Sequence, residues 1–154
     1  MRYIIFILLL FFPATVYSQQ YFDKSKSEVK KELEAYLLDN KAINPALTET
    51  DSTLVLMVND PVAQTARFIY GFDRATGQCN YQRTEAGCNS CYKNYLNNLL
   101  GQKSYDWKKI NENQYVSKFA DRLLLELPVE AKDYSFALFK TQWTKELYDL
   151  LLKD

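Results

Sequence analysis

The stretch TARFIYGFDRATGQCNYQRT, residues 65–84, decides the fold that we expect for this chain. Its first eight residues, TARFIYGF, are rich in aromatic and β-branched side chains, which favour strands. In the next segment, DRATGQ, the aspartate and the glycine provide the turn chemistry of a β-hairpin. QCNYQRT then returns as a second strand, and alternation predicts Cys79, Tyr81 and Arg83 on one face. The stretch therefore predicts two antiparallel strands.

The residues before this hairpin predict a helix, a loop and a further strand. TLVLMV, residues 53–58, is a short apolar run of strand formers, so three successive antiparallel strands are expected. The preceding segment, residues 39–52, contains turn residues and a proline and is predicted to be a loop. A capping-box pattern opens a predicted helix over residues 26–38, whose apolar residues recur at helical spacing: Val29, Leu33, Tyr36 and Leu37.

The residues after the hairpin predict a second helix, more strands and a last helix. The second helix runs from near Cys88 to Leu100, with Gly101 as its C-terminal cap. Strand-like segments follow in SYDWKKI, QYVS, RLLLELP and YSFALFK, the last two joined by the turn EAKD, residues 130–133. A last helix over residues 143–152 would place four apolar residues on one side: Trp143, Leu147, Leu150 and Leu151.

This order of elements predicts the fold class. The chain reads as helix, three strands, helix, three or four strands and helix. Short connections between strands favour antiparallel pairing. We therefore expect an α+β fold, in which an antiparallel sheet of about six or seven strands carries helices on one face.

The N-terminus has the pattern of a secretory signal peptide over residues 1–18. Arg2 provides the positive region, residues 4–12 form an apolar run, and Val16 and Ser18 precede the expected cleavage point. Nine apolar residues are too few for a membrane span, which needs about 20. We expect this segment to be removed, leaving residues 19–154 as a single α+β domain that is secreted or periplasmic and has no membrane span.

Composition excludes several classes of function. The chain has 19 basic and 19 acidic residues, and this balance argues against a nucleic-acid partner, which selects a basic surface. It has no histidine, which excludes Ser-His-Asp catalysis, Cys-His catalysis and histidine-ligated zinc. We expect no cofactor.

Two of the three cysteines, Cys88 and Cys91, form a C-x-x-C motif in TEAGCNSCYKNYL, residues 84–96. The first interpretation is packing, because both extend a helical stripe that continues through Tyr92, Tyr95, Leu96, Leu99 and Leu100. The second is a thiol-disulfide redox pair, since a helix N-terminus lowers the pKa of a thiol. Pro128 follows a predicted strand, as a substrate-binding proline would, but Gly87 before the motif is unlike a thioredoxin-like site.

A structural disulfide is the third interpretation of the cysteines. Cys79 lies on the strand that leads into the second helix, so it can pair with Cys88 or Cys91. Cys79 with Cys91 is our first choice, because one helical turn gives the second side chain room to reach back over the sheet. One thiol is left over in either case. A metal site is not expected, because without a histidine three thiolates would need a carboxylate or water as the fourth ligand, and an oxidising compartment competes for the thiols.

Tyr105 and Trp107 form the remaining candidate binding surface, because alternation places both on one face of a predicted strand. Such a pair can stack on a sugar or a peptide, although aromatic residues at this spacing more often pack inside. We expect a small exported, non-catalytic binding or interaction protein, acting on a protein, peptide or small molecule through a sheet face or a groove beside the second helix. The alternative is a redox protein that uses Cys88 and Cys91.

Overall fold

The computed structural model describes residues 21–39, 45–60, 64–130 and 134–153, and in them helices and strands follow the predicted order. The predicted signal over residues 1–18 lies outside these ranges, as does most of the predicted turn over residues 130–133. An antiparallel sheet of eight strands and three helices confirms the α+β class. None of the described helices is long and apolar enough to cross a membrane.

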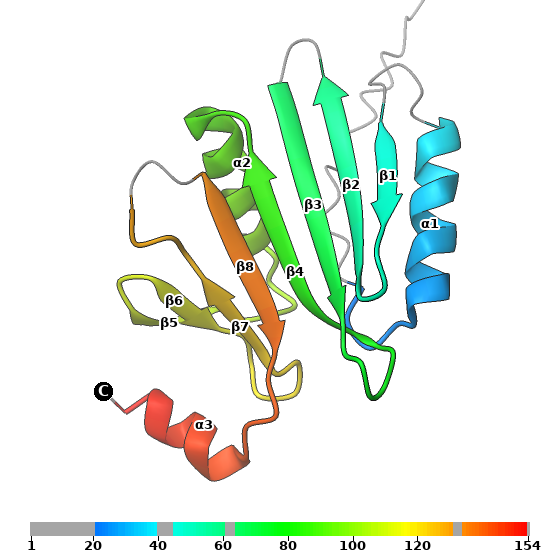
Figure 1. Ribbon diagram of the computed structural model, residues 1–154. Coiled ribbons are helices and arrows are strands. Elements are labelled where there is room, and N and C mark those ends of the chain that lie inside the picture. The colour runs from blue at the N-terminus through cyan, green and yellow to red at the C-terminus, as the bar shows by residue number, and fades with distance from the viewer. Residues whose placement is uncertain (1–20, 40–44, 61–63, 131–133, 154) are drawn as a thin grey trace, which may run out of the picture.

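All eight strands belong to one sheet in which every neighbouring pair is antiparallel (Figure 1). Their order across the sheet is β1-β2-β3-β4-β8-β7-β6-β5. The pairing of β4 with β8 joins the first four strands to the last four. The elements are α1 (Lys26–Asp39), β1 (Ala46–Glu49), β2 (Thr53–Asp60), β3 (Gln64–Phe72), β4 (Cys79–Ala86), α2 (Asn89–Leu100), β5 (Lys108–Asn111), β6 (Gln114–Val116), β7 (Leu123–Glu126), β8 (Ser135–Lys140) and α3 (Lys145–Leu151).

Strand β1 corrects the prediction, because its residues were expected to form part of a loop. Leu47 pairs with Leu56, so β1 extends the sheet beyond β2 at one edge. An edge strand can be short and mostly polar because it has a neighbouring strand on one side only. In β1 the alternation of buried and exposed side chains is weak. The prediction of six or seven strands is therefore one or two too low. Strand β1 was not predicted because it lacks the apolar pattern of a strand.

Helices α1 and α2 cover the same face of the sheet. Cross-strand partners share a face, so the chain of pairs from Leu56 through Phe68 and Thr84 to Phe136 marks one continuous surface across four strands. Helix α1 buries Val29 and Leu33 in one cluster on this surface, and α2 buries Leu99 in a second. Figure 1 shows α2 behind β4 and β8 and α1 beside β1. Tyr95 of α2 packs against both clusters, so the core is continuous.

The local signals for α1 and for the β3–β4 hairpin are confirmed. The Ser25 N–H donates to Glu28 Oε2 at 2.8 Å, and the Glu28 N–H lies 3.4 Å from Ser25 Oγ, which is a reciprocal capping box. In the hairpin, Asp73 Oδ1 accepts from the N–H groups of Ala75 and Thr76. Gly77 has φ of 70°, a left-handed conformation that glycine adopts without a side-chain clash.

A β-bulge in β4 corrects the predicted face of Cys79, Tyr81 and Arg83. Phe72 pairs with Cys79 but Gly71 pairs with Tyr81, so Asn80 is an extra residue and the alternation changes phase. Cys79 is therefore buried among the core residues under the helices. Tyr81 lies on the opposite, open face, where its ring is 5.2 Å from that of Phe139.

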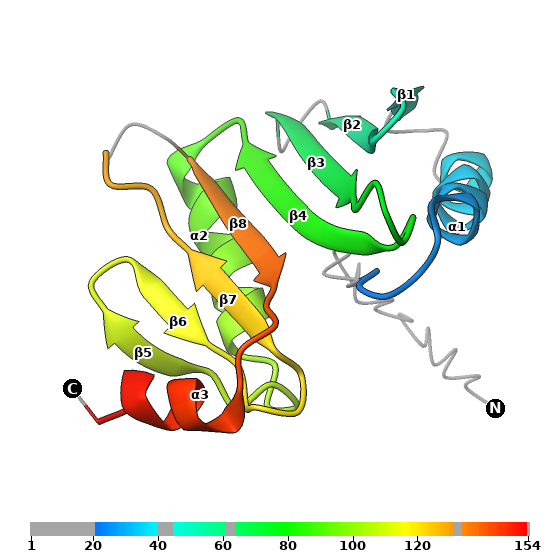
Figure 2. The same cartoon turned by 60° about the horizontal axis from the view of Figure 1, so that its bottom comes forward.

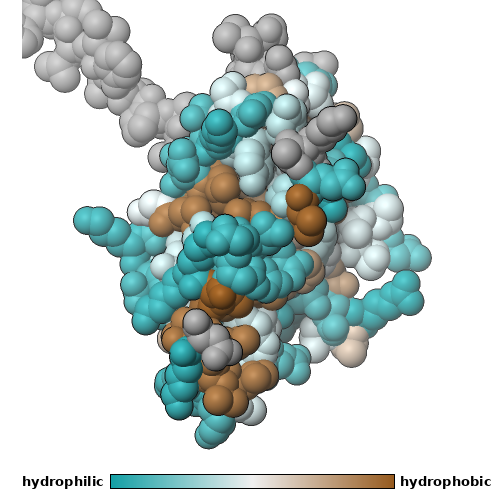
Figure 3. Space-filling model, turned by 90° about the vertical axis from the view of Figure 1, so that its left-hand side faces the viewer, coloured by the Kyte–Doolittle hydropathy of each residue, from teal (hydrophilic) through white to brown (hydrophobic). Residues whose placement is uncertain are grey.

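Helix α3 is shorter than predicted and packs through a different face. It lies beside the β5–β6 end of the sheet (Figure 2) and buries Tyr148, whose hydroxyl donates to the carbonyl of Ser117 at 2.9 Å. Leu147 and Leu150 are 44% and 58% exposed, so the predicted apolar side is not the packed one. Figure 3 shows hydrophobic side chains at the lower end of this side of the molecule, where α3 lies. In this helix of seven residues, the buried contact of Tyr148 decides the packing, and the spacing of the leucines does not.

Candidate functional site

The C-x-x-C motif forms a disulfide at the beginning of α2. Cys88 and Cys91 are bonded, with Cα atoms 5.2 Å apart, because one helical turn brings residues three apart onto one side. The predicted pairing of Cys79 with Cys91 is wrong. The bulge in β4 directs Cys79 into the core, away from the exposed end of α2.

Cys88 is also the N-cap of α2. Its backbone is extended, with φ of −149° and ψ of 157°, and its sulfur accepts a hydrogen bond from the Cys91 N–H at 3.0 Å. Ser90 Oγ lies 3.1 Å from the same sulfur and is the donor, since a disulfide sulfur carries no hydrogen. The first turn of α2 contains no acidic residue, so its positive helix end is not neutralised from within the helix.

The interpretation of both motif cysteines as interior filler is also wrong. Cys88 and Cys91 are half-buried and belong to neither core cluster. The rest of the predicted stripe does pack inside, in the second cluster: Tyr92, Tyr95, Leu96, Leu99 and Leu100. The apolar stripe therefore leaves the core at the N-terminal end of α2, where the disulfide is partly exposed to solvent.

Cys79, in contrast, is a buried free thiol. It is 1% exposed, and burial raises its pKa to about 11. The sulfur donates to the carbonyl of Tyr81 at 3.6 Å and accepts from Gln82 Nε2 at 3.9 Å. At neutral pH this thiol stays protonated and enclosed, which makes it unreactive.

A groove of about 270 Å³ opens beside the first turn of α2. Three parts of the chain form its walls: α2, the turn between β5 and β6, and the segment that follows β7. The Leu127 N–H donates to the carbonyl of Asn113 at 2.7 Å and joins two of these walls. The residues that line it are Asn89, Tyr92, Asn113, Leu127, Pro128, Val129, Glu130 and Tyr134.

The groove combines aromatic and apolar walls with a few polar groups. The rings of Tyr92 and Tyr134 lie 6.5 Å apart at its side, and Val129 is 88% exposed. Asn89 and Asn113 offer amide groups, and among the described residues that line the groove Glu130 is the one acidic or basic side chain. This is the pattern of a ligand site, in which apolar surface provides affinity and a few polar groups fix orientation.

No family model, curated protein or solved structure matches this chain. The geometry of the molecule therefore carries the functional argument. Within the described residues, no group of three or more Cys, Asp or Glu side chains is placed to hold a metal ion.

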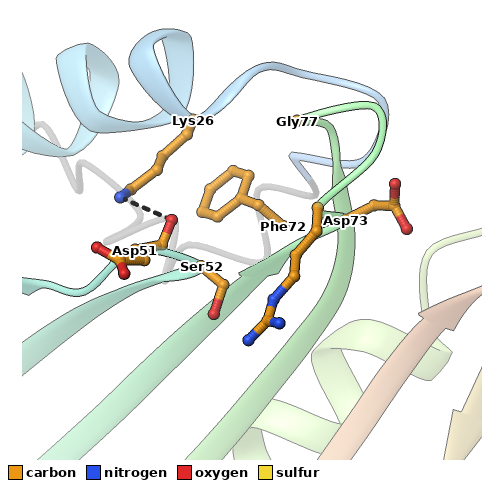
Figure 4. A pocket seen from close by; sticks show the side chains of 7 residues that line it. Lys26, Asp51, Ser52, Phe72, Asp73 and Gly77 are labelled. Carbon is orange, nitrogen blue, oxygen red and sulfur yellow. Dashed lines mark hydrogen bonds between the residues drawn. The ribbon is translucent and has the colours of Figure 1, made fainter.

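A second hollow, of about 450 Å³, lies between the beginning of α1 and the β3–β4 turn (Figure 4). Two of its charged groups, Lys26 and Asp73, already hold the local structure. Lys26 Nζ donates to the backbone carbonyl of Asp51 and forms an ion pair with Glu49 at 2.8 Å. The carboxylate of Asp73 accepts from its own turn, and Figure 4 shows it pointing away from the hollow. This hollow is a weaker candidate than the groove for that reason.

The open face of the sheet is the other surface that the sequence indicated. Its half-buried apolar side chains surround a charged group in which Glu85 pairs with Arg67 at 2.8 Å and with Arg83 at 3.1 Å. Arg83 Nη2 also donates to Ser135 Oγ at 3.1 Å. Because these charged groups pair with one another, the open face has fewer polar groups available to a ligand than the groove has.

Tyr105 and Trp107 lie in an irregular segment before β5, not on a strand. Asp106 between them has φ of 47°, which breaks the predicted alternation. Their rings are 5.6 Å apart, but Trp107 packs against the second core cluster and its Nε1 donates to the carbonyl of Leu99 at 3.0 Å. Packing therefore accounts for Trp107, and the use of the pair as a ligand platform stays a prediction.

Sequence reasoning missed most of the groove. Its walls come from residues about 40 positions apart in the chain, which no local pattern connects. One signal is present in the sequence: Pro128 follows a predicted strand, and it does line the groove beside α2. Tyr92 lies in α2 and Tyr134 directly precedes β8, and nothing in the sequence indicates that their rings lie 6.5 Å apart.

Proposed function

We propose that this protein is a small exported binding protein that holds an extended peptide segment in the groove beside α2. The observation that carries the proposal is the lining of that groove, with two tyrosine rings and three apolar side chains next to two asparagine amides. Aromatic walls bind a hydrophobic side chain, while amides suit the polar main chain of a peptide. Glu130 disfavours an acidic ligand.

The same lining supports binding over acid-base catalysis. General acid-base catalysis needs positioned groups that give and take protons, and Glu130 is the one carboxylate among the described residues of the groove. Export is supported by the apolar leader pattern and by the disulfide, since disulfides persist in oxidising compartments.

Peptide selection tests the proposal. We expect a random phage-displayed peptide library, panned on the mature protein, to enrich sequences with an aromatic or large apolar residue. Tyr92→Ser and Tyr134→Ser should each weaken binding of a selected peptide about tenfold, measured by calorimetry, because each removes one wall.

Tyr36→Ser is the matched control for this experiment. Tyr36 is also a half-buried helical tyrosine that packs against the core, but it lies on α1, away from the groove. This variant should bind the selected peptide as the wild type does. Equal binding by the Tyr92, Tyr134 and Tyr36 variants would contradict the proposal.

A further inference from the structure

The Cys88–Cys91 disulfide stands where a protein can use it chemically. It is half-exposed at the N-terminus of a 12-residue helix, and the Cys91 N–H and Ser90 Oγ both donate to the Cys88 sulfur. The same donors and the positive helix end would stabilise a thiolate at Cys88 after reduction. A stabilised reduced form makes the disulfide a stronger oxidant.

Its value as a structural staple is small by comparison. A disulfide stabilises a protein mainly by restricting the unfolded chain, and this one closes a loop of only four residues. It joins α2 to its own N-cap and connects no separate elements. Cys79 differs from the two bonded cysteines, because it is a buried free thiol whose raised pKa makes it unreactive.

The disulfide adjoins the groove. Asn89 and Tyr92, which line the groove, each directly follow one of the two cysteines. The Tyr92 N–H donates to the Cys88 carbonyl at 2.9 Å, so the backbone of the N-cap is tied to the residue that forms the aromatic wall of the groove. A peptide held against Tyr92 therefore has its neighbouring residues next to Cys88.

We propose that the Cys88–Cys91 disulfide oxidises cysteine pairs in peptides that the groove binds. The choice of peptide rests on the proposed function, whereas the exchange itself does not. A deprotonated peptide cysteine attacks Cys88 Sγ, the Cys88–Cys91 bond breaks, and Cys91 leaves as a thiolate that takes up a proton. The second peptide cysteine, also deprotonated, attacks the first peptide sulfur, and Cys88 leaves as the thiolate that the Cys91 N–H stabilises.

The exchange balances without another reactant. The peptide loses two electrons and two protons as its disulfide forms. Cys88 and Cys91 gain the two electrons, Cys91 takes up one proton, and the other proton goes to solvent because Cys88 remains a thiolate. Each protein molecule oxidises one peptide. The substrate class is an extended, unfolded or flexible polypeptide with two cysteines and a nearby hydrophobic side chain.

Exchange with glutathione tests the chemistry without the groove. The native protein is incubated with reduced glutathione at pH 7, quenched with acid, alkylated and analysed by mass. We expect Cys88 and Cys91 to be reduced while Cys79 stays unlabelled. In the reduced native protein, Cys88 should react with iodoacetamide at least about tenfold faster than Cys79.

Two variants separate the roles of the cysteines. With oxidised glutathione, the Cys88 thiolate of Cys91→Ser should attack the glutathione disulfide, release one reduced glutathione and accumulate as a mixed disulfide, because the second thiol that would resolve it is gone. Cys79→Ser should behave as the wild type. A disulfide that reduced glutathione leaves intact in the native protein, with no mixed disulfide in Cys91→Ser after oxidised glutathione, would overturn the proposal.

A synthetic peptide with two cysteines and one phenylalanine tests the contribution of the groove. We expect the protein to oxidise it one for one, and about tenfold faster than the same peptide with serine in place of phenylalanine. Equal rates for the two peptides, together with rapid glutathione exchange, would remove the peptide selectivity and the proposed groove function. The exchange activity would stand in that case.

Discussion

Tyr148 packs α3 against the rest of the molecule, whereas the sequence predicted that an apolar face with leucines would do so. It is the buried residue of α3, its ring lies 5.5 Å from that of Phe119, and its hydroxyl donates to the Ser117 carbonyl at 2.9 Å. Desolvation raises the pKa of its hydroxyl, and nearby Asp106 adds to the shift. The neutral phenol therefore remains a hydrogen-bond donor throughout the neutral range.

We predict that Tyr148→Phe lowers the free energy of unfolding by about 1 kcal/mol, because the Ser117 carbonyl loses its donor in a buried place. Urea denaturation of the two proteins measures the difference. Leu150→Ser on the same helix is the control, and it should change stability by less than about 0.5 kcal/mol because Leu150 is 58% exposed. A larger loss for Leu150→Ser would show that α3 packs through its leucines.

At the scale of elements, Glu49 connects α1 to the edge strand β1. Its carboxylate pairs with Lys26 at 2.8 Å and Lys30 at 2.7 Å, one turn apart on the helix. These hydrogen bonds lower the pKa of Glu49 from 4.5 to about 2. The pairs occur where β1 has no strand neighbour on its outer side, so they supplement the weak apolar contacts of the edge.

The lowered pKa predicts a dependence of stability on pH. Because the folded pKa lies below the unfolded one, the contribution of Glu49 is present above about pH 4.5 and is lost as the pH falls toward 2. Glu49→Gln should therefore be less stable than the wild type at pH 6, and the two should converge near pH 2. Thermal unfolding followed by circular dichroism over this range checks the prediction, which a constant difference would contradict.

At the scale of the whole molecule, Tyr95 joins the two halves of the core. Its ring makes an edge contact with Phe68 of β3 at 5.6 Å, and it also packs against the cluster that contains Leu125 and Leu138. The β4–β8 pairing links the same halves through the backbone. The sheet therefore behaves as one body only if both connections hold.

We predict that Tyr95→Ala lowers the free energy of unfolding by about 2 to 3 kcal/mol, below the full cost of a buried aromatic because Tyr95 is half-buried. Amide hydrogen exchange should accelerate in both β3 and β7, since both lose a packing partner. Leu38→Ala, at a position that is 69% exposed, is the control and should leave exchange unchanged. Faster exchange in one half only would show that Tyr95 does not couple the two.

The local parts of this architecture could be predicted from the sequence. Periodicity located α1, α2 and the strands β2, β3, β4, β7 and β8, and the Asp73 and Gly77 turn and the Ser25 cap were identified residue by residue. These features depend on interactions within a few residues, which sequence patterns report. Strand β1 was missed because an edge strand needs little apolar character.

The amino-acid sequence by itself determined the α+β class, the hairpin at its centre, the absence of histidine chemistry and the one-turn spacing of Cys88 and Cys91. Only the tertiary structure decided which cysteines pair, because the extra residue at Asn80 turns Cys79 into the core. It also decided where the groove lies, since Tyr92, Pro128 and Tyr134 meet only after β4, β8 and β7 have paired. Short-range preferences act along the chain, whereas a bulge or a groove depends on the register between distant strands.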